Sequence, residues 1–259
     1  MLLRSITKHV SEQNWVAVAI DFVIVVVGVF IGIQVANLNE ARIETQQSKH
    51  FTARLIDDLQ LEAWGLVFAR EYYSDVLAGA DRAISALEGR STLSNEELLI
   101  NAYRASQYKS APAARETFNE LTSIGAISLI RDESLRNLAI SLYEVTEFEE
   151  KRTDEERNNP YRQLFRMILP IKTQRALLKN CGDKTYVVRD YESILKMLDY
   201  PCSTELTEQE IASAANILRT HPDVLPYLRL RMADVETRLT DTADFAWLEQ
   251  LREIAPDMP

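Results

Sequence analysis

The feature that most constrains this chain is a continuous apolar run near its start. The 22 residues from Trp15 to Ala36 contain one charged side chain, Asp21, and no proline. A helix of that length is about 33 Å long, enough to cross the roughly 30 Å hydrocarbon core of a bilayer. A helix in a soluble core, the main alternative, rarely stays apolar on all its faces over so many turns. We therefore predict a single transmembrane helix over residues 15–37.

A cleaved signal peptide is another explanation for an apolar run at this place. Its apolar stretch would be about 7–15 residues long and would precede a small-x-small cleavage site. This run is longer, and the segment Asn37–Glu40 that follows it offers no such site. We expect the helix to be retained and to anchor the chain in a lipid bilayer.

Residues 1–14 precede the span and carry apolar side chains at helical spacing, with charged side chains between them. This pattern predicts an amphipathic segment in the plane of the lipid headgroups. A frayed chain terminus is the alternative, and the pattern does not decide between the two.

One face of the predicted helix carries residues that suit contact with a second helix. At about 100° per residue, Asp21, Gly28, Gly32 and Asn39 share a narrow face, and Ala36 flanks it. Small residues four apart let a second backbone approach closely, and a polar side chain on that face then points at the partner. We predict a helix–helix interface of these five residues. Alternatively, both glycines face lipid and Asp21 reaches toward the headgroups; a proton relay would need a second intramembrane group.

Two segments of the chain resemble a known group of sequences. The first combines Asp21, Gly28 and Gly32 with Asn-Leu-Asn-Glu-Ala-Arg at 37–42, and the second reads TFNELTSIGAISLIRDESLR at 117–136. Together they cover about a quarter of the chain and resemble an uncharacterised family of proteobacterial single-pass membrane proteins. Leu38 departs from the pattern, since family members often carry tryptophan there. The resemblance implies single-pass topology and bacterial origin, and it implies no activity.

The charges that flank the span do not decide its orientation. Two basic residues, Arg4 and Lys8, lie shortly before it, and two, Arg42 and Lys49, lie shortly after it. Because the positive-inside rule counts such residues, it gives a tie.

The cysteines favour one orientation. The chain has two, Cys181 and Cys202, and each lies beside a turn-like dipeptide that would bring the thiols together. Two free, partly buried cysteines are the alternative. A disulfide would persist in a periplasm and not in a cytosol. We therefore predict a bacterial inner-membrane protein with its N-terminus in the cytoplasm and its C-terminal domain in the periplasm.

The remainder of the chain reads as an all-α soluble domain. Seven glycines and eight prolines are few for 259 residues, and alternating strand patterns are nearly absent apart from residues 186–188. We predict a long stalk helix over residues 38–90 that ends at Gly89, followed by a helical soluble domain over residues 91–259. Local start and stop signals divide that domain into helices: capping boxes at 94–97 and 207–210, a stop at Gly125, a cap at Asp132 or Ser134, a stop near Pro160, and a last helix to about Ile254.

No cofactor motif or catalytic constellation is recognisable, and we predict no catalytic, cofactor-binding or metal-binding residues. The net charge of −10 disfavours a nucleic-acid surface. The acidic run at 147–156 could be a metal site, but interleaved basic residues favour a solvated helix face. Four charged residues near Gly125 suggest either a pocket or ordinary capping and ion pairing. These four residues are Glu116, Glu120, Asp132 and Arg136. The three histidines, His9, His50 and His221, are scattered along the chain and form no paired motif.

These observations favour a membrane-anchored, non-catalytic scaffold or accessory subunit that associates with itself or another membrane protein through its transmembrane helix. A periplasmic ligand-sensing helical bundle that signals through a partner is the second hypothesis. An enzyme is the third, because catalysis needs placed titratable groups that the sequence does not reveal.

Overall fold

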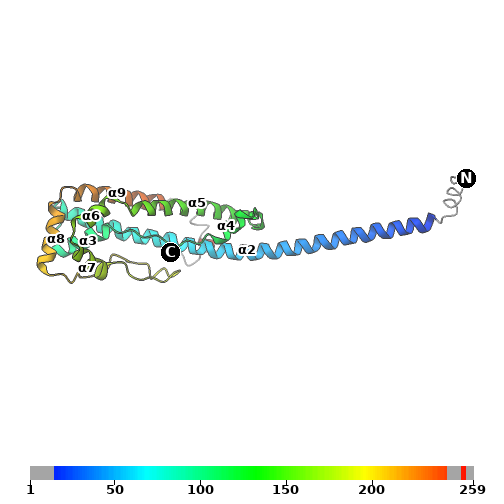
Figure 1. The fold of residues 1–259 in the computed structure, drawn as a ribbon, viewed down its shortest axis with the longest axis horizontal. Coiled ribbons are helices and arrows are strands. Elements are labelled where there is room, and N and C mark those ends of the chain that lie inside the picture. Colours follow the sequence, from blue (N-terminus) through cyan, green and yellow to red (C-terminus); the bar gives the residue numbers. More distant parts are fainter. Residues whose placement is uncertain (1–14, 244–251, 255–259) are drawn as a thin grey trace. The chain divides into compact units, whose positions relative to one another are not determined.

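The computed structural model describes residues 15–243 and 252–254, and in these residues it contains helices and no strand (Figure 1). The all-α prediction is therefore confirmed. The predicted amphipathic segment at 1–14 lies outside the described residues. Contacts divide the chain into two compact units, Met1–Thr52 and Ala53–Pro259.

Helix α2 (Trp15–Leu87) is continuous over 73 residues, as the unbroken helical periodicity predicts. It ends where the sequence places its stop. The Arg90 N–H donates to the Ser85 carbonyl at 2.8 Å, and the Gly89 N–H donates to the Ala86 carbonyl at 3.1 Å. These two bonds satisfy carbonyls that a helix end leaves unpaired. They require a left-handed residue, and Gly89 has φ +73°.

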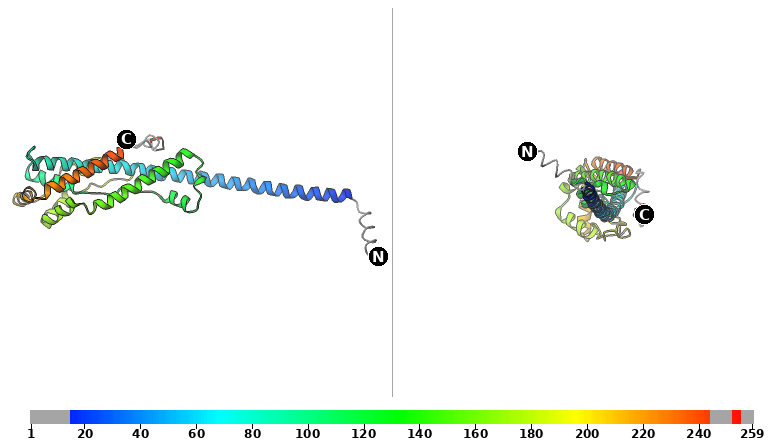
Figure 2. Two further views of the ribbon diagram at one scale, coloured as in Figure 1. Left: turned by 90° about the horizontal axis from the view of Figure 1, so that it is seen from above. Right: turned by 90° about the vertical axis from the view of Figure 1, so that its right-hand side faces the viewer.

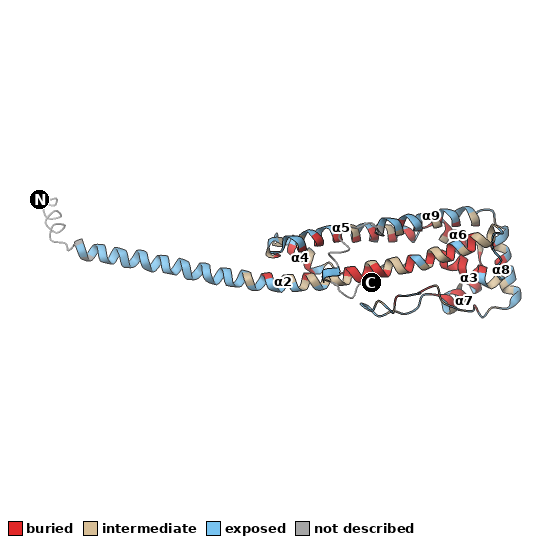
Figure 3. Ribbon diagram, turned by 180° about the vertical axis from the view of Figure 1, so that it is seen from behind, coloured by how far each residue is buried: buried red, intermediate tan, exposed pale blue. Residues whose placement is uncertain are grey.

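In the first unit, every described side chain from Val16 to Glu44 is exposed (Figure 3). Sixteen of these are large apolar side chains that are each at least 43% exposed, among them Phe22, Ile24 and Phe30. This part of α2 is the one helix among the described residues that is long and apolar enough to cross a membrane. So large an exposed apolar surface needs lipid or a protein partner to cover it.

In the second unit, α2 is the central core helix of the domain. From Leu55 onward most of its apolar side chains are buried, and Leu59, Trp64, Phe68 and Tyr72 are fully inaccessible. The predicted stalk over 38–90 is therefore wrong as a separate element, because the domain begins at Ala53 and not at residue 91. Periodicity identified the helix correctly, but it could not show that the apolar face is covered by helices from later in the chain.

The helices that follow α2 begin and end near the local signals. Ser94 and Glu97 form the predicted capping box, as do Thr207 and Glu210. Asp132 caps its helix by accepting from the Leu135 N–H at 3.1 Å. The helices are α3 (Asn95–Ala105), α4 (Glu116–Ser123), a 3-10 turn η1 (Ile127–Leu129), α5 (Glu133–Glu156), α6 (Pro160–Ile168), α7 (Ile171–Cys181), α8 (Glu208–Thr220) and α9 (Val224–Ala243). Most of the stretch over which the last helix was expected to continue lies outside the described residues.

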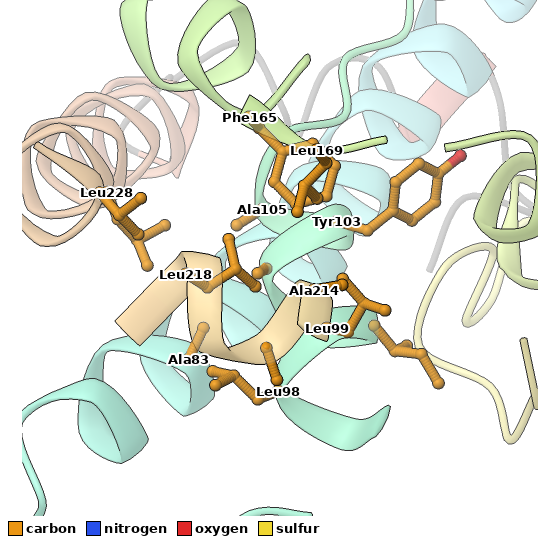
Figure 4. Packing of buried hydrophobic residues seen from close by; sticks show 14 of the residues in the cluster. Ala83, Leu98, Leu99, Tyr103, Ala105, Phe165, Leu169, Ala214, Leu218 and Leu228 are labelled. Carbon is orange, nitrogen blue, oxygen red and sulfur yellow. The ribbon is translucent and has the colours of Figure 1, made fainter. Parts of the chain in front are cut away.

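The domain core is formed by helices that pack around the C-terminal end of α2. Helix α3 packs against α8, and α6 packs against α9. Figure 4 shows Leu98 and Leu99 of α3 close to Ala214 and Leu218 of α8, in one buried cluster. Helices α5 and α9 are neighbours in both Figure 1 and Figure 2. Arg231 of α9 pairs with Glu156 of α5, and Arg238, further along α9, pairs with the earlier Glu149, so the two helices are antiparallel.

The short strand suggested at 186–188 is not formed. The Tyr186 ring instead lies 4.9 Å from the Phe68 ring and 5.7 Å from the Trp64 ring, measured between centroids. A strand needs a neighbouring strand to pair with, and none exists in the described residues. This loop is therefore held to α2 by its aromatic side chain.

Candidate functional site

The five residues of the predicted interface all lie in α2, in the first unit, and all are exposed. An added Cβ at Gly28 or Gly32 would meet no other atom within 4 Å. Two other glycines of the same helix differ. A Cβ at Gly65 would lie 2.8 Å from the Pro112 carbonyl oxygen, and one at Gly79 would lie 2.9 Å from an α3 side-chain atom.

This contrast separates two reasons for glycine in one helix. Each glycine in a helix interior costs roughly 0.5–1 kcal/mol relative to alanine. At Gly65 and Gly79 the domain's own packing accounts for that cost, because a larger residue would not fit. At Gly28 and Gly32 no contact within this chain accounts for it. The close approach that such glycines permit is therefore available to a second helix.

The two cysteines form a disulfide and are not the free, partly buried pair that was the alternative. The sulfur atoms of Cys181 and Cys202 are 2.11 Å apart and the Cα atoms 5.5 Å apart. The intervening loop is bound to α2 by polar contacts as well as by Tyr186. The Asp75 carboxylate accepts from the Leu198 and Asp199 N–H groups at 2.9 and 3.2 Å.

The acidic run on α5 is only partly the solvated face that the sequence predicts. Glu147 is exposed and pairs with Lys151 at 2.6 Å, as expected. Glu149 and Glu156 are each only 8% exposed, so for them the prediction is wrong. Glu149, Thr153 and Glu156 recur at helical spacing on one side of α5, and that spacing is the sequence signal that could have revealed their burial.

Two arginines of α9 pair with these buried carboxylates. Arg231 binds Glu156, and the Arg238 Nη2 atom lies 2.8 Å from Glu149 Oε2. Both guanidinium groups lie over the Tyr73 ring, at 5.9 and 3.8 Å from its centroid. Buried charges persist when they are paired, and each of these four groups has a partner of opposite charge.

Beside this cluster is a small cavity of about 40 Å³, lined in part by Glu62, Thr146, Glu149 and Arg238. Glu62 is 2% exposed, and one of its carboxylate oxygens accepts from the Ala114 N–H at 2.7 Å. Burial raises the pKa of Glu62 to about 7, although the Ala114 N–H and the charge of Arg115 act in the opposite direction. Glu62 therefore exchanges a proton near neutral pH. The sequence gave no sign of this burial, since Glu62 is a single glutamate in an apolar stretch.

Three of the four charged residues near Gly125 each have a separate partner. Glu120 pairs with Arg54 at 2.8 Å, Asp132 caps α5, and Arg136 donates to the Ile130 carbonyl at 2.5 Å. Gly125 itself has φ +69° and ends α4, as the sequence predicts.

The described part of the chain contains no cluster of side chains that could hold a metal ion. Nowhere in it do three or more His, Cys, Asp or Glu side chains come together around a common point. His50 is exposed, His221 is half-buried, and His9 lies outside the described residues.

Comparisons of this chain with models of protein families, with curated proteins and with solved structures find no match. The fold and the sites described above define an all-α domain that follows one N-terminal helix long and apolar enough to span a membrane.

Proposed function

We propose that this chain is a membrane-anchored, non-catalytic scaffold or accessory subunit. It associates with itself or with another membrane protein through the face of the transmembrane helix that carries Asp21, Gly28, Gly32, Ala36 and Asn39. The observation that supports this most directly is the pair of exposed glycines for which the chain's own packing gives no reason. Helix pairing in lipid relies on such close backbone approach, since hydrophobic burial supplies no driving force there.

The polar residue on the same face adds to this proposal. Asp21 is exposed on α2 and lies in the apolar run. A carboxylate facing hydrocarbon costs roughly 2.5–3.5 kcal/mol at the centre of a span on insertion scales. A partner helix that covers the glycine face would also cover Asp21 and give it a hydrogen-bonding neighbour.

We further propose that the protein lies in a bacterial inner membrane with its N-terminus in the cytoplasm and its domain in the periplasm. The resemblance to a proteobacterial single-pass family implies the single span and the bacterial origin. The disulfide supports the orientation, because cytosolic reductants keep protein thiols reduced. Alkylating free thiols in intact cells before lysis tests it: Cys181 and Cys202 should resist alkylation until a reductant is added. Two thiols that react at once would refute this orientation.

The helix contact is tested by replacing Gly28 and Gly32 together with isoleucine. An added side chain there meets nothing in the chain itself, so folding of the monomer should be unaffected. We expect in-membrane crosslinking to itself or to a partner to be lost, together with co-purification in mild detergent.

A matched control adds the same bulk to the opposite face. Val23 and Val26 lie about 200° and 140° around the helix from Asp21, and both are exposed. Replacing both with phenylalanine adds four carbon atoms at each site, as Gly→Ile does, and should leave crosslinking intact; both double variants should remain in the membrane fraction. Undiminished crosslinking of the glycine variant would defeat the proposal.

A further inference from the structure

One segment of the domain differs in charge from the rest of the chain. From Arg157 to Cys181 the sequence contains six arginine and lysine residues and no aspartate or glutamate, although the whole chain has a net charge of −10. This segment forms α6 and α7. A positive surface on an acidic protein raises the local concentration of anions.

A cleft of about 190 Å³ lies along this segment, between α6, α7 and the last turn of α3. Three arginines line it: Arg162 and Arg166 from α6, and Arg175 from α7. Phe165 lines it beside Tyr103 of α3, with 6.2 Å between the ring centroids, and Figure 4 labels both rings.

The positive charges outside the cleft are already neutralised. Lys172 pairs with Glu210 at 2.5 Å, and Lys179 lies 3.8 Å from a Glu205 carboxylate oxygen. Arg166 and Arg175 are exposed and, in the part of the chain that the structure describes, no carboxylate lies within ion-pairing distance of either guanidinium. The cleft therefore keeps positive charge that the described residues do not balance.

Arg162 is held in place at the inner side of the cleft. Its Nη1 atom donates to the Ser106 carbonyl at 2.8 Å, and its guanidinium lies 4.6 Å from the centroid of the Tyr108 ring. Burial lowers the pKa of Arg162, and the positive charge of Arg166 lowers it further. A bound anion would relieve that repulsion between neighbouring cations.

Two apolar side chains that line the cleft are open to solvent. Ile171 is 62% exposed and Leu178 is 68% exposed, although both are large apolar residues. Pockets for drug-sized ligands usually have roughly 300–1,000 Å³, so this smaller cleft suits a small ligand.

We propose that this cleft binds a small organic anion with an apolar body. The anionic group, a carboxylate or a phosphate, lies against Arg166 and Arg175, with Arg162 behind them. The apolar body covers Ile171 and Leu178, the two exposed apolar side chains of the cleft. Arginine suits this role because its planar guanidinium donates two parallel hydrogen bonds to an oxyanion. The site is in the second unit and does not depend on the helix pairing proposed above.

The test uses the full chain in nanodiscs of zwitterionic lipid, with phenylpropionate as the probe. Titration followed by ligand-observed NMR, with empty nanodiscs as the blank, should show saturable binding. Phenylpropanol, which keeps the apolar body and lacks the charge, should bind at least about tenfold more weakly. Absence of saturable binding, or equal affinity for the alcohol, would overturn the proposal.

Paired variants locate the site. Arg166→Gln with Arg175→Gln should raise the dissociation constant of phenylpropionate about tenfold or more. Lys172→Gln with Lys179→Gln removes the same charge from the same segment outside the cleft, and should change that constant less than about twofold. Far-UV circular dichroism checks that both variants are folded. Equal weakening by both pairs would mean a diffuse charge effect and would refute the site.

Two further arms identify other occupants. If nanodiscs of anionic lipid abolish phenylpropionate binding, the cleft is a lipid-binding surface. If an acidic peptide with aromatic residues displaces the probe at a concentration about tenfold lower than phenylpropionate itself needs, the cleft is a docking site for a protein segment. Either result overturns a small-molecule site, and the failure of both to compete supports it.

Discussion

Glu62 offers a direct measurement of what burying an ionisable group does to this domain. Its side chain is 2% exposed, and one of its carboxylate oxygens accepts from the Ala114 N–H at 2.7 Å. Burial is the largest cause that raises its pKa, from 4.5 to about 7. Replacing it with glutamine keeps an oxygen for the Ala114 N–H and removes the proton that titrates.

The sign of the effect follows from where the proton is lost. Below about pH 4.5 the carboxyl group is protonated in the folded and the unfolded chain, so it adds no pH dependence. Between about pH 4.5 and 7 the unfolded chain loses this proton while the folded chain keeps it, and the free energy of unfolding falls. At about 1.4 kcal/mol per pKa unit, the loss above pH 7 is about 3 kcal/mol.

The assay is urea unfolding of the full chain in detergent micelles, followed by tryptophan fluorescence from pH 4.5 to 8. We expect the difference in unfolding free energy, Glu62→Gln minus wild type, to rise by about 3 kcal/mol across that range. Glu144→Gln, a change at an exposed position of α5, is the control and should show no such rise. A difference for Glu62→Gln that is constant with pH, or that falls, would refute the reasoning.

Three other predictions concern the stability of the domain. Replacing Cys181 and Cys202 with serine should lower the free energy of unfolding by about 3 kcal/mol, since the bond closes a loop with a sequence separation of 21; urea unfolding measures this, and a wild type unaffected by reductant would contradict it. Arg231→Met should cost about 3–5 kcal/mol because it leaves Glu156 buried without its partner, whereas adding Glu156→Leu should restore much of the loss; a double variant no more stable than the single one would be the contrary result. Gly79→Ala should lower the midpoint of thermal unfolding, because the new Cβ would lie 2.9 Å from an α3 side-chain atom and overpacking costs about 1–3 kcal/mol; an unchanged midpoint would show that α3 moves aside freely.

The features that the sequence predicted well depend on neighbours along the chain. Ser94 caps α3 because Glu97 is three residues away, and Gly89 ends α2 because that position needs a positive φ. The apolar run from Trp15 to Ala36 is readable for the same reason, since length and composition alone decide whether a helix is able to cross a bilayer.

The features that were mispredicted depend on contacts between distant segments. Residues 53–87 were interpreted as a stalk because nothing local shows that later helices, among them α3 and α9, pack against them. Tyr186 was assigned to a possible strand, although its ring packs on Trp64 and Phe68, more than a hundred residues earlier in the chain.

The sequence by itself therefore determined an apolar anchor-length helix, an all-α domain and most of the helix ends, because capping, backbone torsion and periodicity act over a few residues. Only the tertiary structure decided which charged groups are buried. Glu147 and Glu149 are two residues apart, yet one is solvated and the other pairs with Arg238 of α9. It also separated Gly65 and Gly79, which the domain's packing requires, from Gly28 and Gly32, which it does not. Burial and close packing arise from segments brought together in space, and local sequence carries little information about them.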